Sequence, residues 1–136
     1  MTETQFYKEI DKNTWPDDIP SKNQFQGSDL TVQTPRWEYH RGPGSGGDNE
    51  AQDFKVPDDH VLVGWNANET SCIGCSGQAF QLVMIETGTR TFPIGIRTGA
   101  RLEPGGLGGS GAYFTGDLSL ISVPRSVWNR VADSIP

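Results

Sequence analysis

Residues 78–97 read QAFQLVMIETGTRTFPIGIR, and this segment contains the longest apolar run of the chain. Apolar residues occupy both sets of alternating positions in residues 80–85, so both faces of a β-strand would be apolar there. We therefore expect residues 78–87 to form a central strand. The following Thr-Gly-Thr-Arg sequence predicts a hairpin turn into a second strand over residues 91–97. Pro93 lies inside that second strand and predicts a sheet edge or a β-bulge, because proline has no N–H to donate.

Shorter segments on both sides of this hairpin also alternate with a period of two. The pattern is clear in residues 36–41, where Trp37 and Tyr39 alternate with Glu38 and His40. Weaker strand signals mark residues 29–33, 52–56, 60–66 and 112–123, and residues 124–133 predict one short helix. Seven or eight short strands without strand–helix alternation predict a mainly β protein with an antiparallel β-sandwich or jelly-roll-like fold.

The first 27 residues differ from the rest and are predicted to form an N-terminal arm, followed by a single β-rich domain over residues 28–136. Phe6, Tyr7 and Ile10 are spaced as one side of a short helix, while Pro16 and Pro20 exclude helix beyond it. A free tail is rarely so rich in aromatic residues. We therefore expect the arm to pack on something, either its own domain or a neighbouring subunit.

The charge of the chain is uneven. The net charge is −6, and residues 1–60 hold twelve acidic residues against six basic ones. An acidic surface repels phosphate backbones and anionic lipid, so we expect no nucleic-acid binding. The acidic half is interpreted as a solubilising surface, a docking face for a basic partner, or carboxylates for Ca²⁺.

The N-terminal sequence indicates how the protein reaches its location. It lacks the basic start and apolar core of a signal peptide, which favours cytoplasmic synthesis without export through the Sec system. No segment approaches the roughly 20 apolar residues of a membrane span, so no membrane insertion is expected.

Cys72 and Cys75 form the only familiar motif, a CxxC pair. Such a pair can be a redox dithiol, half of a zinc site, or two turn thiols that are reduced or closed into a local disulfide. Redox pairs usually begin a helix, but a strand pattern follows here. A zinc site needs four ligands, and the only histidines, His40 and His60, are not a close pair. The third interpretation is therefore favoured.

No other motif indicates catalysis or a cofactor. The Gly-rich residues 104–111 lack the Lys-Ser/Thr of a phosphate-binding loop. His60 follows two aspartates, but a histidine at the start of a strand is usually structural, and no pair of carboxylates stands out. We expect no enzymatic activity, no cofactor and no resident metal.

Aromatic residues are the remaining candidates for recognition. Trp65 and Trp128 are interpreted as core residues, whereas Trp37 and Tyr39 lie on a more polar strand and are expected at the surface. Exposed aromatic rings anchor protein interfaces, and they also stack on sugars. The candidate binding residues are Phe6, Tyr7, Trp15, Phe25, Trp37 and Tyr39.

Two functional hypotheses follow. The first is a non-enzymatic structural subunit that assembles with other protein subunits, as a homo-oligomer or in a larger particle such as a virus or phage virion. The second is a glycan-binding module of the lectin type. Residues 92–95 and 116–120 resemble calcium-dependent galactose-binding sandwiches, but the Asn-Asp pair and calcium loop of those proteins are missing, so no family is assigned.

Overall fold

The computed structural model describes residues 3–88, 90–105 and 111–134, and it shows eight strands, two short 3-10 turns and one helix in that part of the chain. The first strands are short: β1 (Thr4–Glu9), β2 (Thr31–Gln33), β3 (Arg36–Arg41) and β4 (Asp48–Lys55). The later strands are 13 or 14 residues long: β5 (His60–Ile73), β6 (Cys75–Thr87), β7 (Arg90–Leu102) and β8 (Ala112–Pro124). The 3-10 turns are η1 (Lys22–Gln24) and η2 (Gly27–Asp29), and the helix is α1 (Arg125–Ser134).

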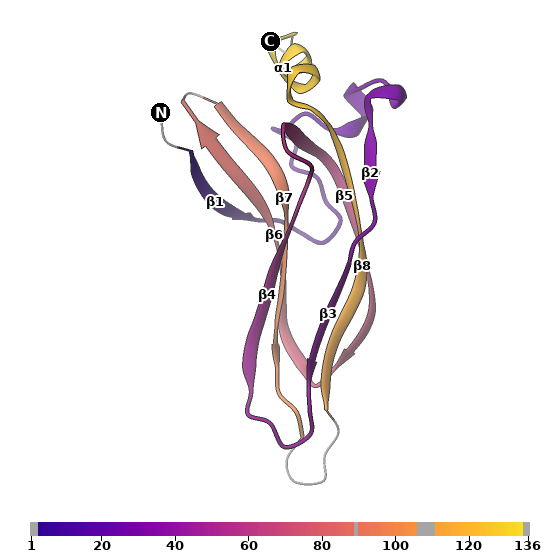
Figure 1. Cartoon of the computed structure of the whole chain (residues 1–136), viewed down its shortest axis with the longest axis vertical. Helices are drawn as coiled ribbons and strands as arrows, with labels where there is room; N and C mark the ends of the chain where they lie inside the picture. The colour runs from indigo at the N-terminus through magenta and orange to yellow at the C-terminus, as the bar shows by residue number, and fades with distance from the viewer. Residues whose placement is uncertain (1–2, 89, 106–110, 135–136) are drawn as a thin grey trace.

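The strands form two antiparallel sheets, as the sequence predicts. Sheet A has the order β1-β6-β7-β4. In sheet B, strand β8 pairs with β5 on one side and with both β2 and β3 on the other. The two sheets form an elongated sandwich, with α1 and the N-terminal end of the chain at one end and the β5–β6 corner at the other (Figure 1).

The β6–β7 hairpin confirms the strand prediction for residues 78–97. Strand β6 is central, and the pairing begins at Thr87 and Arg90, although Thr89 of the turn lies outside the described residues. Strand β7 is also central, and the register shifts where Met84 pairs with Pro93. The bulge, rather than the edge, is therefore the correct reading of Pro93. The strand pattern was right, but the prediction that all strands are short was wrong, because β5 to β8 extend the full length of the sandwich.

Trp37 and Tyr39 lie in the main core between the sheets, so the expectation that they are surface residues is wrong. Trp37 is fully buried and Tyr39 is 7% exposed. The alternation in β3 does place Glu38 and His40 outside, but sheet A covers the other face. Trp37 packs against Phe80 of that sheet, with ring centroids 5.8 Å apart.

A second, smaller core closes the end of the sandwich that carries α1. Trp128 of α1 is 5% exposed, and its ring lies 5.1 Å from the ring of Phe92. Val61, Val63 and Val123 complete the buried cluster. Trp65 belongs to the main core, so both tryptophans that were interpreted as core residues are buried.

The first residues form strand β1 rather than the short helix that the spacing of Phe6, Tyr7 and Ile10 indicates. Each residue of β1 pairs with β6, from Thr4 opposite Glu86 to Glu9 opposite Gln81. The helix prediction was wrong because β6 offers a ladder of hydrogen-bonding partners, which outweighs the weak local preference of so short a segment.

Residues 10–30 then run across the side of the sandwich, and we call them the strap. The N–H of Ile10 donates to the carbonyl of Phe80 in β6 at 3.3 Å. The side-chain amide of Asn13 bonds both backbone groups of Ala67 in β5, at 2.6 and 3.4 Å. The strap therefore joins one strand of each sheet, and the aromatic N-terminal segment packs on its own domain.

Cys72 and Cys75 form a disulfide at the corner where the chain leaves β5 in sheet B and enters β6 in sheet A. The structure thus contains the local disulfide among the alternatives for this pair. Gly74 between them has a φ of +63°, a conformation that glycine adopts without strain.

Candidate functional site

The candidate site is the margin of sheet A formed by β1, which is an edge strand. Four of its side chains face alternate sides of the sheet. Gln5 and Tyr7 point outward, and Phe6 and Lys8 point toward the strap. Because successive side chains alternate in a strand, the two sets have different tasks.

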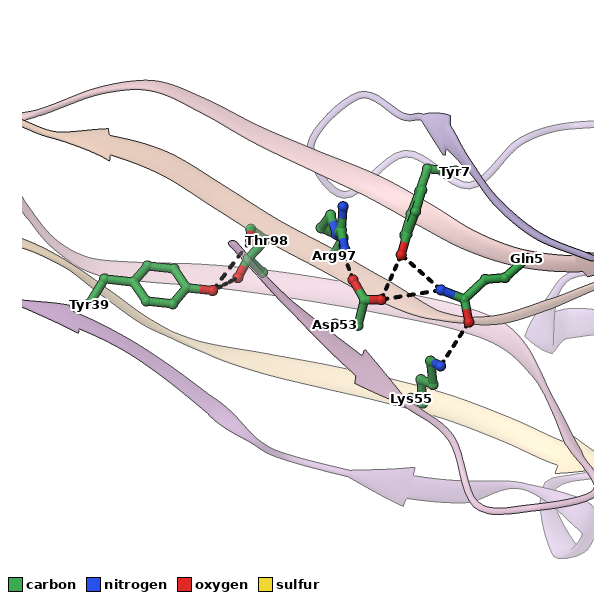
Figure 2. A network of polar contacts seen from close by, with 7 residues as sticks. All are labelled: Gln5, Tyr7, Tyr39, Asp53, Lys55, Arg97 and Thr98. Carbon is green, nitrogen blue, oxygen red and sulfur yellow. Dashed lines mark hydrogen bonds and ion pairs between the residues drawn. The ribbon is translucent and has the colours of Figure 1, made fainter. Parts of the chain in front are cut away.

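On the outer face, Tyr7 and Asp53 connect the two margins of sheet A. The Tyr7 hydroxyl donates to Asp53 Oδ2 at 2.9 Å, and Arg97 Nε donates to Asp53 Oδ1 at 2.7 Å (Figure 2). The Arg97 guanidinium also lies 4.0 Å from the centre of the Tyr7 ring, which is within the range of a cation–π interaction. Val83, the cross-strand neighbour of Tyr7, is fully buried although it lies on this outer face.

Gln5 adds a second connection between β1 and β4. Its side-chain oxygen accepts a hydrogen bond from Lys55 Nζ at 2.8 Å, and its Nε2 donates to the Tyr7 hydroxyl at 2.8 Å (Figure 2). These contacts hold β1 in a fixed position on the sheet. We call this hydrogen-bonded set on the outer face the lock, because it joins β1 to β4 and β7. It consists of Gln5, Tyr7, Asp53, Lys55 and Arg97.

The inner face of β1 is only partly covered by the rest of the fold. Phe6 is 38% exposed and lines a groove of about 330 Å³ together with Met84, Pro93 and Trp128. The strap forms the opposite wall with Ile19 and Pro20. An ion pair between Lys8 and Asp18, 3.7 Å long, lies at the same groove. This side of β1 therefore exposes an aromatic ring beside an apolar depression.

The other candidate residues of the arm are held by the fold. The Trp15 ring packs on the main core, and its Nε1 donates to the carbonyl of Ile19 at 3.1 Å. Phe25 packs on the smaller core. Of the six residues predicted to bind partners, the structure brings Phe6 and Tyr7 to one margin and places Trp15 and Phe25 in the strap.

Tyr39 bonds to sheet A from within the core. Its hydroxyl lies 2.7 Å from Thr98 Oγ1, and Thr98 is fully buried (Figure 2). Burial raises the pKa of Tyr39, and the hydrogen bond to Thr98 opposes this shift. Tyr39 therefore joins the two sheets from within the core and does not lie at the surface.

Asp53, Arg97, Gln5 and Lys55 were not identified from the sequence. Tyr7 and Asp53 are 46 positions apart, and Asp53 and Arg97 are 44 apart, so no local pattern relates them. An alternating strand signal places polar residues on an outer face, but it does not say which of them meet.

The outer face of sheet B is polar and bears a row of rings and apolar groups at one end. His40 and Ile73 both pair with Tyr113, so the three side chains form one row across β3, β8 and β5. The His40 and Tyr113 rings meet edge to face, 5.2 Å apart, and Ile73 is 52% exposed. Next to them lie hydroxyl, amide and charged side chains: Arg36, Glu38, Asn66, Asn68, Thr115 and Asp117.

The described residues contain no group of three or more His, Cys, Asp or Glu side chains placed to hold a metal ion. His60 Nδ1 lies 3.0 Å from Ser122 Oγ, but Ser122 is fully buried. The Ser122 hydroxyl is therefore shielded from solvent. Within the same described part of the chain, no helix has the length and apolar character that crossing a bilayer requires.

Comparison with protein-family models, with curated proteins and with solved structures finds no match for this chain in any of the three. The β1 margin and the outer face of sheet B are therefore the two candidate surfaces for recognition.

Proposed function

We propose that this chain is a non-enzymatic assembly subunit that docks onto another protein subunit through the β1 margin. The observation that carries this proposal is the exposed Phe6 ring beside an apolar groove on an edge strand. Aromatic anchors that fill pockets commonly dominate the energy of protein interfaces. The lock supports the proposal, because it fixes β1 before a partner arrives and lowers the entropic cost of binding.

A larger particle, such as a virus or phage virion, is the proposed setting. Small β proteins with an N-terminal arm commonly serve as accessory subunits there, and this is an analogy of architecture alone. In this proposal the arm contributes through β1, while the strap keeps β1 attached to its own sandwich.

The test is incorporation of the tagged chain into large particles in its native source, measured by sedimentation. We expect the wild type to sediment with particles and Phe6→Ser to remain in the slow fraction. Val32→Ser is the matched control, because Val32 is 60% exposed but lies in sheet B. Circular dichroism must show that both variants are folded. A wild-type chain found only as a free monomer, or a Phe6→Ser variant that assembles normally, would refute the proposal.

A second candidate function, glycan binding, is favoured by the outer face of sheet B. The row of His40, Tyr113 and Ile73 offers rings and apolar contact, and the adjacent Asn68 and Asp117 offer hydrogen bonds to hydroxyl groups. A glycan array probed with the wild type and with Tyr113→Ala tests this candidate. Specific binding that the substitution abolishes would support it, and an array without any signal would remove it.

A further inference from the structure

We infer that the docking partner is an extended, basic segment of another protein that adds to β1 as a fifth strand of sheet A. This inference rests on the proposed function and specifies its partner. Three features of β1 support strand addition: the direction of its backbone groups, the position of the groove and the local charge.

On the side away from β6, the backbone N–H and C=O groups of β1 pair with no strand among the described residues, so they are free to pair with another strand. The N–H of Ile10 points to Phe80 of β6, and backbone groups alternate in direction along a strand. The N–H groups of Phe6 and Lys8 therefore point to β6, and those of Gln5, Tyr7 and Glu9 point to the open side. No hydrogen bond within the described residues uses these three outward groups.

The groove lies where alternate side chains of an added strand would enter. A residue opposite Phe6 shares its face of the sheet, so its side chain would lie beside the Phe6 ring and the groove with Met84 and Trp128. Residues opposite Gln5 and Tyr7 would face solvent. A segment that alternates apolar and polar residues meets both requirements, as in other cases where a peptide extends a sheet.

The charge around this margin favours a basic partner and disfavours a second copy of this chain. The cations at this margin already have partners. Lys8 is paired with Asp18 and Arg97 with Asp53. Lys55 donates a hydrogen bond to the side chain of Gln5. Glu3 and Glu9 are exposed and share the outer face with Gln5. Basic residues opposite them would be stabilising, whereas two copies of β1 would add acid to acid.

The test measures hydrogen exchange of individual amides with and without a short capped peptide of alternating lysine and valine. At a peptide concentration of about ten times Kd, we expect exchange at Gln5, Tyr7 and Glu9 to slow by about tenfold. The amides of Phe6 and Lys8 are already bonded to β6 and should change less. A peptide of alternating glutamate and valine is the charge control and should bind at least about tenfold more weakly.

Two variants of Glu9 separate the contribution of backbone hydrogen bonds to peptide binding from the contribution of charge. Glu9→Pro removes an outward N–H without removing a bond to β6, and it should abolish the protection of Gln5 and Tyr7. Glu9→Gln keeps the N–H and should retain the protection pattern with weaker binding. Protection that survives Glu9→Pro would overturn strand addition, and so would peptide binding that leaves the outward amides unchanged.

The outcomes distinguish docking through β1 from the more specific addition of a basic strand to it. Outward amides that become protected in the concentrated protein alone would show a second copy as the occupant and overturn the basic partner. Loss of particle incorporation in Phe6→Ser, without any protection of outward amides by the lysine peptide, would leave the docking function standing and refute strand addition alone.

Discussion

Replacement of Asp53 by Asn tests whether the polar network on the outer face of sheet A holds β1 in place. Asp53 accepts hydrogen bonds from Tyr7 and Arg97, and its side chain is 18% exposed. Hydrogen bonds to a charged group contribute about 1.5–3 kcal/mol when partly shielded from water. The asparagine retains one accepting oxygen but no charge, so we expect a loss of about 2 kcal/mol.

This loss converts into a measurable shift in melting temperature. The entropy of unfolding is about 2.1 cal/mol/K per residue, or about 0.3 kcal/mol/K for 136 residues. A loss of about 2 kcal/mol therefore lowers Tm by about 7 °C. Calorimetry measures the shift, and hydrogen exchange at Phe6 and Lys8 should accelerate because β1 detaches more often.

Asp117→Asn is the matched control. Asp117 also pairs with an arginine, Arg36, at 3.1 Å, but both side chains are about half exposed. Exposed pairs contribute about 0.5 kcal/mol, so we expect a shift of about 2 °C that vanishes in 1 M salt. Equal shifts for Asp53→Asn and Asp117→Asn, or unchanged exchange in β1, would refute the view that the network locks this strand.

Three further predictions concern the rest of the sandwich. Gly116→Ala should cost roughly 2–3 kcal/mol in urea unfolding, because the new Cβ would overlap the indole of Trp37; a loss below about 0.5 kcal/mol would contradict this packing. Burial raises the pKa of Tyr39, so the unfolded chain ionises first and stability falls as the pH rises above about 10. Tyr39→Phe should therefore be less stable near neutral pH but lose less stability between pH 9 and 11, and an unchanged slope would argue against a buried phenol. Reduction of Cys72 and Cys75 should cost about 2 kcal/mol for so short a loop, measured as a Tm about 7 °C lower in reductant, while Cys72→Ser should be insensitive to reductant.

Local patterns were sufficient to locate most strands. The alternation in residues 36–41 matches β3 residue for residue, and the hairpin of β6 and β7 follows from the run in residues 78–97. The predicted helix near the C-terminus is α1. These predictions succeed because the period of the apolar residues and the turn residues are properties of neighbouring positions.

The failures involve partners that are distant in sequence. The polar face of residues 36–41 predicts Trp37 and Tyr39 at the surface, because the alternation does not say which face of the strand meets the second sheet. The local spacing of Phe6 and Tyr7 predicts a helix. They form a strand because they pair with β6, which lies almost 80 residues later in the sequence and leaves no local signal. Strand pairing over such distances is decided by the whole fold rather than by local propensity.

The amino-acid sequence by itself determined that this protein is built from antiparallel strands with one terminal helix, because backbone period and turn chemistry act between near neighbours. The tertiary structure alone decided which aromatic rings became core and which stayed at the margin. It also decided that Tyr7, Asp53 and Arg97 would meet, although dozens of residues separate them. The physical reason is that burial and hydrogen bonding depend on what lies across the sheet, and only the folded chain brings those groups together.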